Sequence, residues 1–256
     1  MLRTTTGVWR SLVWGVCVAL LATMVWRPFA FGQQAEDPAE SKPAARPLSK
    51  DPPGMKRLMP EYDVWIDPKN KRVVMDGTVC LREGQLEMFA CPKGTKEHES
   101  IVAVRTKAYV VHAALLAVGA ESGQPAIFTP KYRPASGTTI DVEIEWQDSA
   151  GKTRRARAQD MVRLSKTKGP MTQEWVFGGS GFYEDPVEKV RYYQAESGDL
   201  ICVSNFPSAT LDLPIESSQA NEALLFEANT DKIPPVGTPV KVVLTPKLEM
   251  GDAAKE

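Results

Sequence analysis

The feature that most constrains the fold is a succession of short apolar runs that begins at Tyr62 and continues nearly to the C-terminus. Each run spans roughly four to eight residues and ends in a cluster of Gly, Pro, Asn, Asp or Ser. The run from Ile140 to Trp146 alternates strictly between apolar and acidic residues. This pattern is typical of strands that bury one face, so it predicts mainly antiparallel β structure in sandwich- or barrel-like sheets.

One segment departs from this pattern. Residues 107–118 are nearly all apolar and helix-tolerant, and only Lys107 and His112 among them are polar. Thr106 is placed to cap the N-terminus of a helix, and Gly119 stands where helices commonly end. A helix that is apolar nearly all round must be packed on several sides. We therefore predict an α+β fold in which one helix, near residues 107–118, is buried against the sheets.

Two local signals bear on how the strands pair. Asp76-Gly77 is typical of a tight hairpin turn and predicts one at this position. The basic stretch 152–157 follows the acidic strand 141–145 after a cluster of turn residues. Opposite charges at this spacing favour pairing across a hairpin over a site for polyanions.

The N-terminal residues predict the compartment. Arg3 and Arg10 precede an apolar run, and Ala30-Phe31-Gly32 offers small residues to a signal peptidase, which is the layout of a secretory signal. The apolar run is shorter than the roughly twenty residues that span a membrane as a helix. We predict an exported protein, periplasmic or extracellular, in which residues 1–32 are cleaved or residues 11–26 remain as a membrane anchor.

The remaining chain divides by composition. Residues 33–60 contain six prolines and no aromatic residue, which predicts a disordered, Pro-rich tether. Residues 61–247 are long enough to form a single globular domain with its own core. Residues 248–256 are predicted to be a disordered C-terminal tail.

Charge and cysteine content exclude some functions. Residues 1–32 contain three of the 31 basic side chains and no acid, so the rest has 28 basic and 32 acidic side chains. This balance gives no electrostatic reason to expect nucleic acid as a partner, and membrane contact is expected only through an uncleaved N-terminal segment. Because no C-x-x-C pair is present, no iron–sulfur cluster is expected.

The segment Cys91–Ser100 concentrates side chains that can carry chemistry. The candidate functional residues are Cys91, Lys96, Glu97, His98 and Glu99, together with His112 in the predicted helix. Cys91, His98 and His112 are suitable ligands for a single transition metal if this loop folds back over the helix, although the spacing matches no standard zinc motif. The alternatives are a solvated loop, in which the glutamates pair with lysines, and a core histidine at position 112.

Cys80 and Cys91 are also candidates for a disulfide in an oxidising compartment. Their pairing depends on the turn between them. A two-residue turn at Glu83-Gly84 sets the two sulfurs about 13 Å apart, whereas a wider loop brings them opposite one another. Cys202 lies within an apolar strand, where we predict a buried and inert thiol.

Two further motifs carry weaker signals. In Gly178–Phe182 the last glycine of a G-x-S-x-G nucleophile elbow is replaced by Phe182, and a chain with two histidines gives little support to a serine triad. The aromatic residues Phe182, Tyr183, Tyr192 and Tyr193 would suit a platform for a sugar or peptide. Aromatic residues in strands more often belong to the core.

Six short motifs carry a resemblance to a known family. They are Leu86–Cys91, Gly94–Ser100, His112–Leu116, Trp175–Ser180, Cys202–Pro207 and Asn229–Pro235. Taken in this order, they resemble the YdjY-domain proteins of bacteria over roughly residues 62–246. The resemblance implies an exported protein without an established biochemical activity. Some members of that family carry ferredoxin-like cysteine clusters, which this chain lacks, so no redox role is carried over.

The sequence favours a non-enzymatic exported module that binds a small ligand or another envelope protein, and it identifies neither partner. The absence of a catalytic triad, a nucleotide-binding loop and a zinc motif supports this interpretation. The alternative is a metal- or thiol-dependent enzyme, or a metal carrier, built on Cys91, Glu97, His98 and His112. A third interpretation makes the domain a structural part of an envelope assembly.

Overall fold

A computed structural model describes residues 48–218 and 223–248 of the chain. The predicted signal, residues 33–47 of the predicted tether and all but the first residue of the predicted tail lie outside the described residues. Everything described belongs to one compact unit, Arg46–Glu256, which has its own core. Within these described ranges, no helix is long and apolar enough to cross a membrane.

The elements are mostly short strands. Helix α1 spans Ala108–Ala117, and the 3₁₀ helices are η1 (Glu97–Glu99), η2 (Ala158–Met161), η3 (Gln194–Ser197) and η5 (Thr230–Lys232). The strands are β1 (Lys56–Arg57), β2 (Val64–Asp67), β3 (Arg72–Val79), β4 (Met88–Pro92), β5 (Ser100–Val104), β6 (Thr139–Gln147), β7 (Thr153–Arg157), β8 (Val162–Leu164), β9 (Trp175–Phe177), β10 (Phe182–Glu184), β11 (Arg191–Tyr193), β12 (Ile201–Cys202), β13 (Leu211–Asp212), β14 (Phe226–Ala228) and β15 (Pro239–Pro246).

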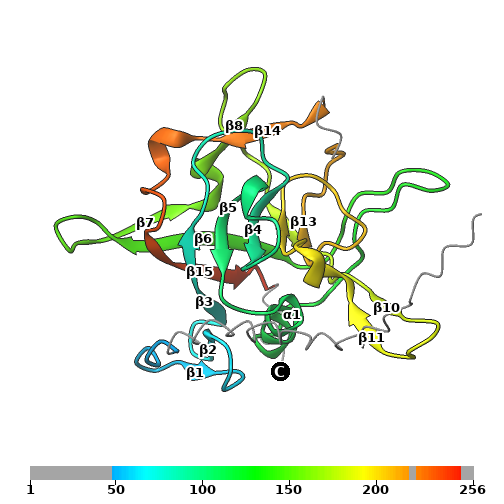
Figure 1. Cartoon of the computed structure of the whole chain (residues 1–256), viewed down its shortest axis with the longest axis horizontal. Helices are drawn as coiled ribbons and strands as arrows, with labels where there is room; N and C mark the ends of the chain where they lie inside the picture. Colours follow the sequence, from blue (N-terminus) through cyan, green and yellow to red (C-terminus); the bar gives the residue numbers. More distant parts are fainter. Residues whose placement is uncertain (1–47, 219–222, 249–256) are drawn as a thin grey trace, which may run out of the picture. The chain divides into compact units, whose positions relative to one another are not determined.

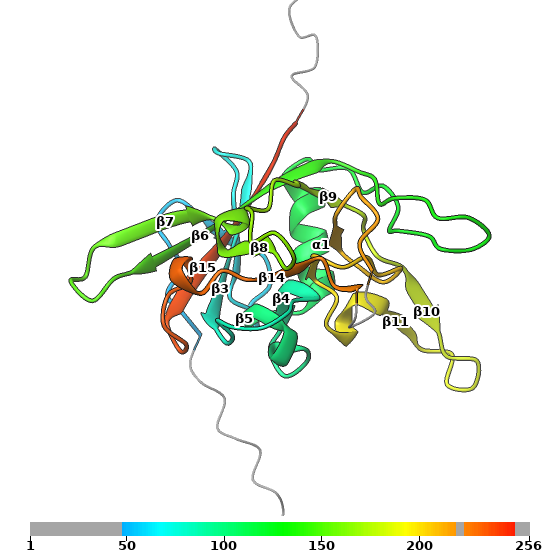
Figure 2. The same cartoon turned by 90° about the horizontal axis from the view of Figure 1, so that it is seen from above.

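Eight of these strands close into a barrel (Figures 1 and 2). Their order is β3-β15-β6-β9-β13-β12-β4-β5, and β5 pairs back onto β3. Two of the pairs, β4–β5 and β12–β13, are parallel, and the other pairs around the barrel are antiparallel. The prediction of a mainly antiparallel β fold with one helix is confirmed, and the closed barrel is the form that it takes.

Strand β6 shows how the sequence pattern directs the chain. Its apolar residues Ile140, Val142 and Ile144 are buried, while the acidic residues between them face outward. Strand β7 pairs antiparallel with β6 and brings the guanidinium of Arg155 to Glu143 and Glu145. The predicted pairing of opposite charges across this hairpin is confirmed.

The predicted turn at Asp76-Gly77 is wrong, because both residues lie inside β3. The hairpin turn lies earlier, between β2 and β3, where Asp67 pairs with Arg72 and accepts a hydrogen bond from the backbone N–H of Asn70. Gly77 has a packing role instead. A Cβ at this position would stand 2.8 Å from Cγ1 of Val102 on the neighbouring β5, so glycine allows the two strands to approach.

Helix α1 lies against β2 and β3, with Val111 and Leu115 fully buried. Leu116 on the opposite side is 48 % exposed, so the expectation of a helix buried on several sides is wrong in this respect. The sheet covers only one side of this helix. Lys107, not the expected Thr106, occupies the N-cap position, and Gly119 follows the helix with a φ of 98°, as predicted.

The N-terminal boundary of the folded part also differs from the prediction. Part of the segment assigned to the tether, residues 48–60, lies against the barrel and includes β1, which pairs with β2. Arg57 forms ion pairs with Asp51 and Asp63, and the buried indole of Trp65 donates a hydrogen bond to Asp51. Side-chain hydrogen bonds and charges hold this segment, which composition alone does not reveal.

The packing around Gly77 gives a test of barrel closure. We expect Gly77→Ala to lower the free energy of unfolding by about 1–3 kcal/mol, because the added methyl group overpacks the contact with Val102. Urea unfolding monitored by tryptophan fluorescence measures this loss. Thr78→Ala, at the neighbouring outward position of β3, is the matched control and should cost less than about 1 kcal/mol. Equal losses in the two variants would contradict the packing role.

Candidate functional site

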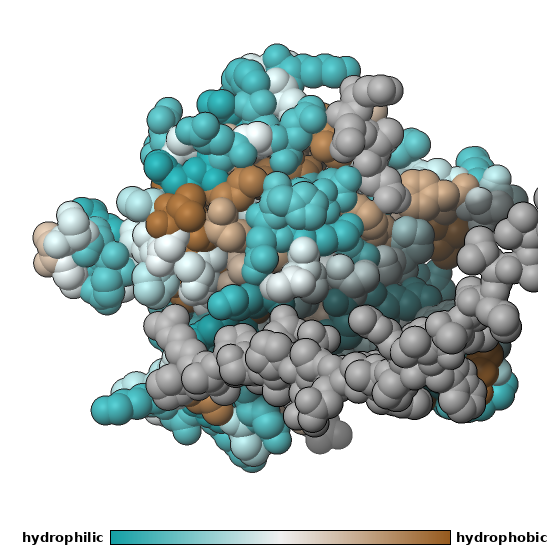
Figure 3. Space-filling model, in the orientation of Figure 1, coloured by the Kyte–Doolittle hydropathy of each residue, from teal (hydrophilic) through white to brown (hydrophobic). Residues whose placement is uncertain are grey.

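The predicted cluster lies in the loop that joins β4 to β5. Cys91 lies within β4 and is fully buried, whereas the side chain of His98 in η1 is 76 % exposed. Oε1 of Glu97 accepts a hydrogen bond from the backbone N–H of Gly94, 2.9 Å away, and so closes the loop on itself. Figure 3 shows hydrophilic residues over this part of the surface. The side chains of the cluster therefore point in different directions.

The three predicted metal ligands are not brought together. Burial raises the pKa of the Cys91 thiol, which keeps it protonated at neutral pH, and His98 points into solvent. His112 lies in α1, where it contacts other residues. Among the residues that the structure describes, no three His, Cys, Asp or Glu side chains are placed to hold a metal ion.

His112 packs between aromatic rings. Its Nδ1 lies 2.9 Å from the hydroxyl of Tyr193, and its ring contacts Phe177 edge-on. Burial lowers the pKa of His112, so the imidazole is neutral at pH 7. This environment matches the alternative of a core histidine. It also fixes Tyr193, whose hydroxyl donates a hydrogen bond to the carbonyl of Gly179.

The disulfide between Cys80 and Cys91, one of the two arrangements that the sequence left open, is not formed, and both residues are free thiols in the structure. The sequence argument assumed that these cysteines lie on neighbouring strands. Strand β5 instead lies between β4, which contains Cys91, and β3, which Cys80 follows. Two strand spacings are roughly 9–10 Å, beyond the reach of a disulfide. The thiol of Cys80 donates a hydrogen bond to the carbonyl of Ser100 instead.

Lys96 is the centre of a charged cluster, hereafter the Lys96 cluster, formed with Glu87, Glu99 and Asp199. Its Nζ lies 3.1 Å from Asp199 Oδ1 and 3.6 Å from a carboxylate oxygen of each glutamate. The ammonium group also lies 4.2 Å from the ring centroid of Phe206. Residues that are far apart in the sequence therefore meet around one cation.

Electrostatics within the Lys96 cluster are strongly coupled. Burial alone would lower the pKa of Lys96, but Asp199, Glu99 and Glu87 outweigh it and raise this pKa. Burial and the negative charge of Glu99 raise the pKa of Glu87. A positive charge is therefore held among carboxylates that partly repel one another.

Sequence reasoning identified Lys96 and Glu99 but missed Glu87 and Asp199. Asp199 follows a Glu-Ser-Gly sequence that indicates only a turn. Its burial depends on the loop after β12, from which Ser208 donates a hydrogen bond to its carboxylate. Gly198, with a φ of 133°, leaves room for the side chain of Lys96, since a Cβ there would stand 2.6 Å from Cγ of that lysine.

A second buried carboxylate lies on β13. Asp212 is fully buried, and its Oδ1 accepts hydrogen bonds from the side chain of Asn205 and the backbone N–H of Leu213. Burial raises the pKa of Asp212 to about 7, despite these hydrogen bonds. No sequence signal marks this group, because an Asp beside a leucine in a short strand is common.

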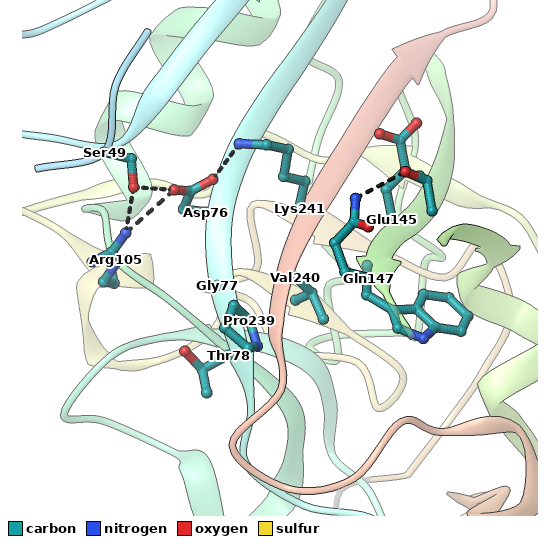
Figure 4. Close-up of a pocket in the computed structure, with 12 residues that line it drawn as sticks. Ser49, Asp76, Gly77, Thr78, Arg105, Glu145, Gln147, Pro239, Val240 and Lys241 are labelled. Carbon is teal, nitrogen blue, oxygen red and sulfur yellow. Dashed lines mark hydrogen bonds and ion pairs between the residues drawn. The ribbon is translucent and has the colours of Figure 1, made fainter. Parts of the chain in front are cut away.

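The outer face of the barrel contains a groove of about 400 Å³ over β3, β15 and β6. Figure 4 shows Asp76 on one side of this groove, where it accepts hydrogen bonds from Lys241, Arg105 and Ser49. On the other side Gln147 donates a hydrogen bond to Thr153. The charged side chains that line the groove already pair with one another or with neighbouring residues. The groove therefore has room for a small polar ligand but presents no unpaired charge to it.

The largest group of exposed apolar side chains lies on the hairpin formed by β10 and β11, hereafter the β10–β11 hairpin. This hairpin is a separate two-stranded sheet that projects from the barrel (Figures 1 and 2). Of the eleven large apolar side chains exposed in the described residues, five lie on it and are 45–86 % exposed. They are Phe182, Tyr183, Val187, Val190 and Tyr192.

The aromatic residues of this hairpin were weighed from the sequence as a binding platform or as core. The structure divides them: Tyr193 is buried, whereas Phe182, Tyr183 and Tyr192 are exposed. Tyr183 and Tyr192 point to one face of the hairpin, whereas Phe182 shares the other face with Tyr193 and contacts its ring edge-on, with centroids 5.4 Å apart. Exposed apolar groups gathered in this way commonly mark an interaction surface.

These observations define a small closed β-barrel protein with one outer helix and a projecting apolar hairpin. The family model of the YdjY domain matches residues 64–245. The chain therefore belongs to the YdjY-domain family. No curated protein and no solved structure matches it.

The Lys96 cluster gives a prediction for stability. Lys96→Met leaves the buried carboxylate of Asp199 without a cation, and we expect a loss of roughly 1–3 kcal/mol in the free energy of unfolding. This is less than for a fully buried pair, because solvent reaches Lys96. Chemical denaturation measures the loss. Adding Asp199→Asn to Lys96→Met removes the unpaired charge and should recover part of the lost stability. If the double variant recovers none of this stability, the pairing of Lys96 with Asp199 is contradicted.

Asp212 gives a prediction for pH dependence. Its pKa is raised in the folded state, so its contribution to stability is fully present below about pH 4 and is lost as the pH rises to about 7. Asp212→Asn removes this titration. The quantity compared is the free energy of unfolding of Asp212→Asn minus that of the unmodified chain. We expect this difference to be roughly 2–4 kcal/mol larger at pH 8 than at pH 4. Urea titrations at both pH values test this, and a constant difference would refute it.

Proposed function

We propose that this YdjY-domain chain is an exported, non-enzymatic module that binds another protein of the cell envelope through the β10–β11 hairpin. The observation that carries the proposal is the exposure of Phe182, Tyr183, Val187, Val190 and Tyr192 on one projecting element. Of these, Tyr183, Val190 and Tyr192 share one face of the hairpin, and burying exposed apolar side chains against a partner is favourable.

Export is part of this proposal. The basic residues and apolar run at the N-terminus support a secretory signal at residues 1–32, or an anchor at residues 11–26. The Pro-rich composition of residues 33–47 supports a tether, which would give the domain reach to a partner at the envelope.

The alternative of a metal- or thiol-dependent site has less support. Cys91 is a buried thiol with a raised pKa, and His98 and His112 lie in different environments. A reactive cysteine needs an accessible thiolate, which the surroundings of Cys91 disfavour. The Lys96 cluster fits a structural role, since its ammonium and carboxylates satisfy one another.

Site-specific cross-linking tests this proposal. A photoreactive phenylalanine analogue in place of Tyr183, in the full chain and in the cells that produce it, should give a discrete cross-linked product with another protein chain. The same analogue at Val236, which is also exposed but distant in sequence, is the control. The absence of any product at Tyr183 above this control would overturn the proposal.

A further inference from the structure

Among the described residues, the outward backbone groups of the β10–β11 hairpin have no backbone hydrogen-bond partner at its edges. Asp185 donates its backbone N–H to Val190, and Gln194 donates its own to Gly181. With the register Tyr183 opposite Tyr192, these bonds direct the backbone groups of Tyr183 inward, toward β11. Those of Phe182 and Glu184 therefore point outward along the edge of β10. Such an edge is a template for another strand.

The two outward residues are spaced so that this edge is complementary to itself. If a two-fold axis passes at Tyr183, the β10 strands of two copies run antiparallel and Phe182 of each copy faces Glu184 of the other. In that register each outward N–H and C=O of these two residues meets a partner. The two Tyr183 side chains meet across the axis, on the face that also carries Val190 and Tyr192.

Charge supports the same arrangement. Glu184 and Arg191 lie opposite one another in the register of β10 and β11, yet within residues 48–218 and 223–248 neither residue forms an ion pair. The guanidinium of Arg191 lies over the ring of Phe182, 4.7 Å from its centroid. In the two-fold arrangement, Glu184 faces Phe182 of the other copy. The Arg191 guanidinium of that copy lies over the same Phe182 ring, so Glu184 comes close to this guanidinium. Each copy then brings a further opposite charge to Glu184 and Arg191 of the other.

Two other free strand edges in the described residues are protected against the addition of a strand. Strand β7 pairs only with β6, and its residues include Arg154, Arg155 and Arg157, charges that oppose pairing with a second chain. Strand β1 consists of only two basic residues, Lys56–Arg57. A two-stranded hairpin is marginally stable alone, so the exposed β10–β11 hairpin gains most from added strands.

We infer that the partner at the β10–β11 hairpin is a second copy of this chain, joined by antiparallel pairing of β10 with β10 into a four-stranded intermolecular sheet. This inference rests on the proposed function and names its partner. The apolar face of the joined sheet gathers Tyr183, Val190 and Tyr192 of both copies, and the opposite face pairs Glu184 with Arg191 between copies.

Sedimentation equilibrium of residues 33–256, which retain the whole described unit, tests the inference. We expect a particle of twice the mass of one chain at micromolar concentration. Tyr183→Asp places two like charges opposite one another at the axis and should weaken the dimer by roughly tenfold or more. Val236→Asp, an exposed residue outside the hairpin, should leave it unchanged. A dimer that survives Tyr183→Asp would overturn the arrangement.

A charge exchange tests the register. Glu184→Arg and Arg191→Glu should each weaken self-association, and mixing the two variant chains should restore it, because each altered residue then meets the opposite charge only in the other copy. Thermal unfolding checks that each variant remains folded. Failure of the mixed variants to associate, with each chain still folded, would refute the proposed register.

The cross-linking experiment at Tyr183 separates this inference from the proposed function. A product of two identical chains, together with a dimer in solution, supports both. A product with a different protein, together with a monomer in solution, overturns the second copy as partner and leaves the binding module standing. No product above the Val236 control, together with a monomer, overturns both.

Discussion

Strand β3 is the element on which the barrel depends, because it forms backbone ladders with β15 on one side and with β5 on the other. Without both ladders the sheet is open and its core is exposed. The same strand also pairs with β2 through its first residues, which brings the buried ring of Trp65 against the barrel. Gly77 is required where β3 and β5 approach most closely, while the outward carboxylate of its neighbour Asp76 organises the groove on the outer face.

The Lys96 cluster adds a charged link between two neighbouring strands of the barrel, β4 and β12. Its ammonium group links the β4–β5 loop to Asp199, which lies before β12. In doing so Lys96 supplies a positive charge to Glu87, Glu99 and Asp199. A buried carboxylate needs such a charge or several hydrogen bonds. This explains why a loop with acids, a thiol and a histidine need not be a metal site.

Much of the fold follows from local sequence, whereas the charged clusters do not. The alternation in β6 and the position of Gly119 are local properties, and the structure agrees with both. Asp76-Gly77 failed as a turn because a packing constraint from β5, distant in sequence, governs Gly77. The environments of Asp199 and Asp212 depend on strand order around the barrel. That order involves two parallel pairs and many long-range ladders, which periodicity cannot specify.

The position of the β10–β11 hairpin relative to the barrel is fixed at its base. Tyr193, the last residue of β11, is buried, and its hydroxyl contacts His112 on α1, the carbonyl of Gly179 and Thr210. These contacts orient the exposed strand before any partner arrives, so binding has less conformational entropy to lose. The free edge and the apolar face lie beyond this anchor, and the barrel strands already have their own partners. A strand can therefore be added to the hairpin without opening the barrel.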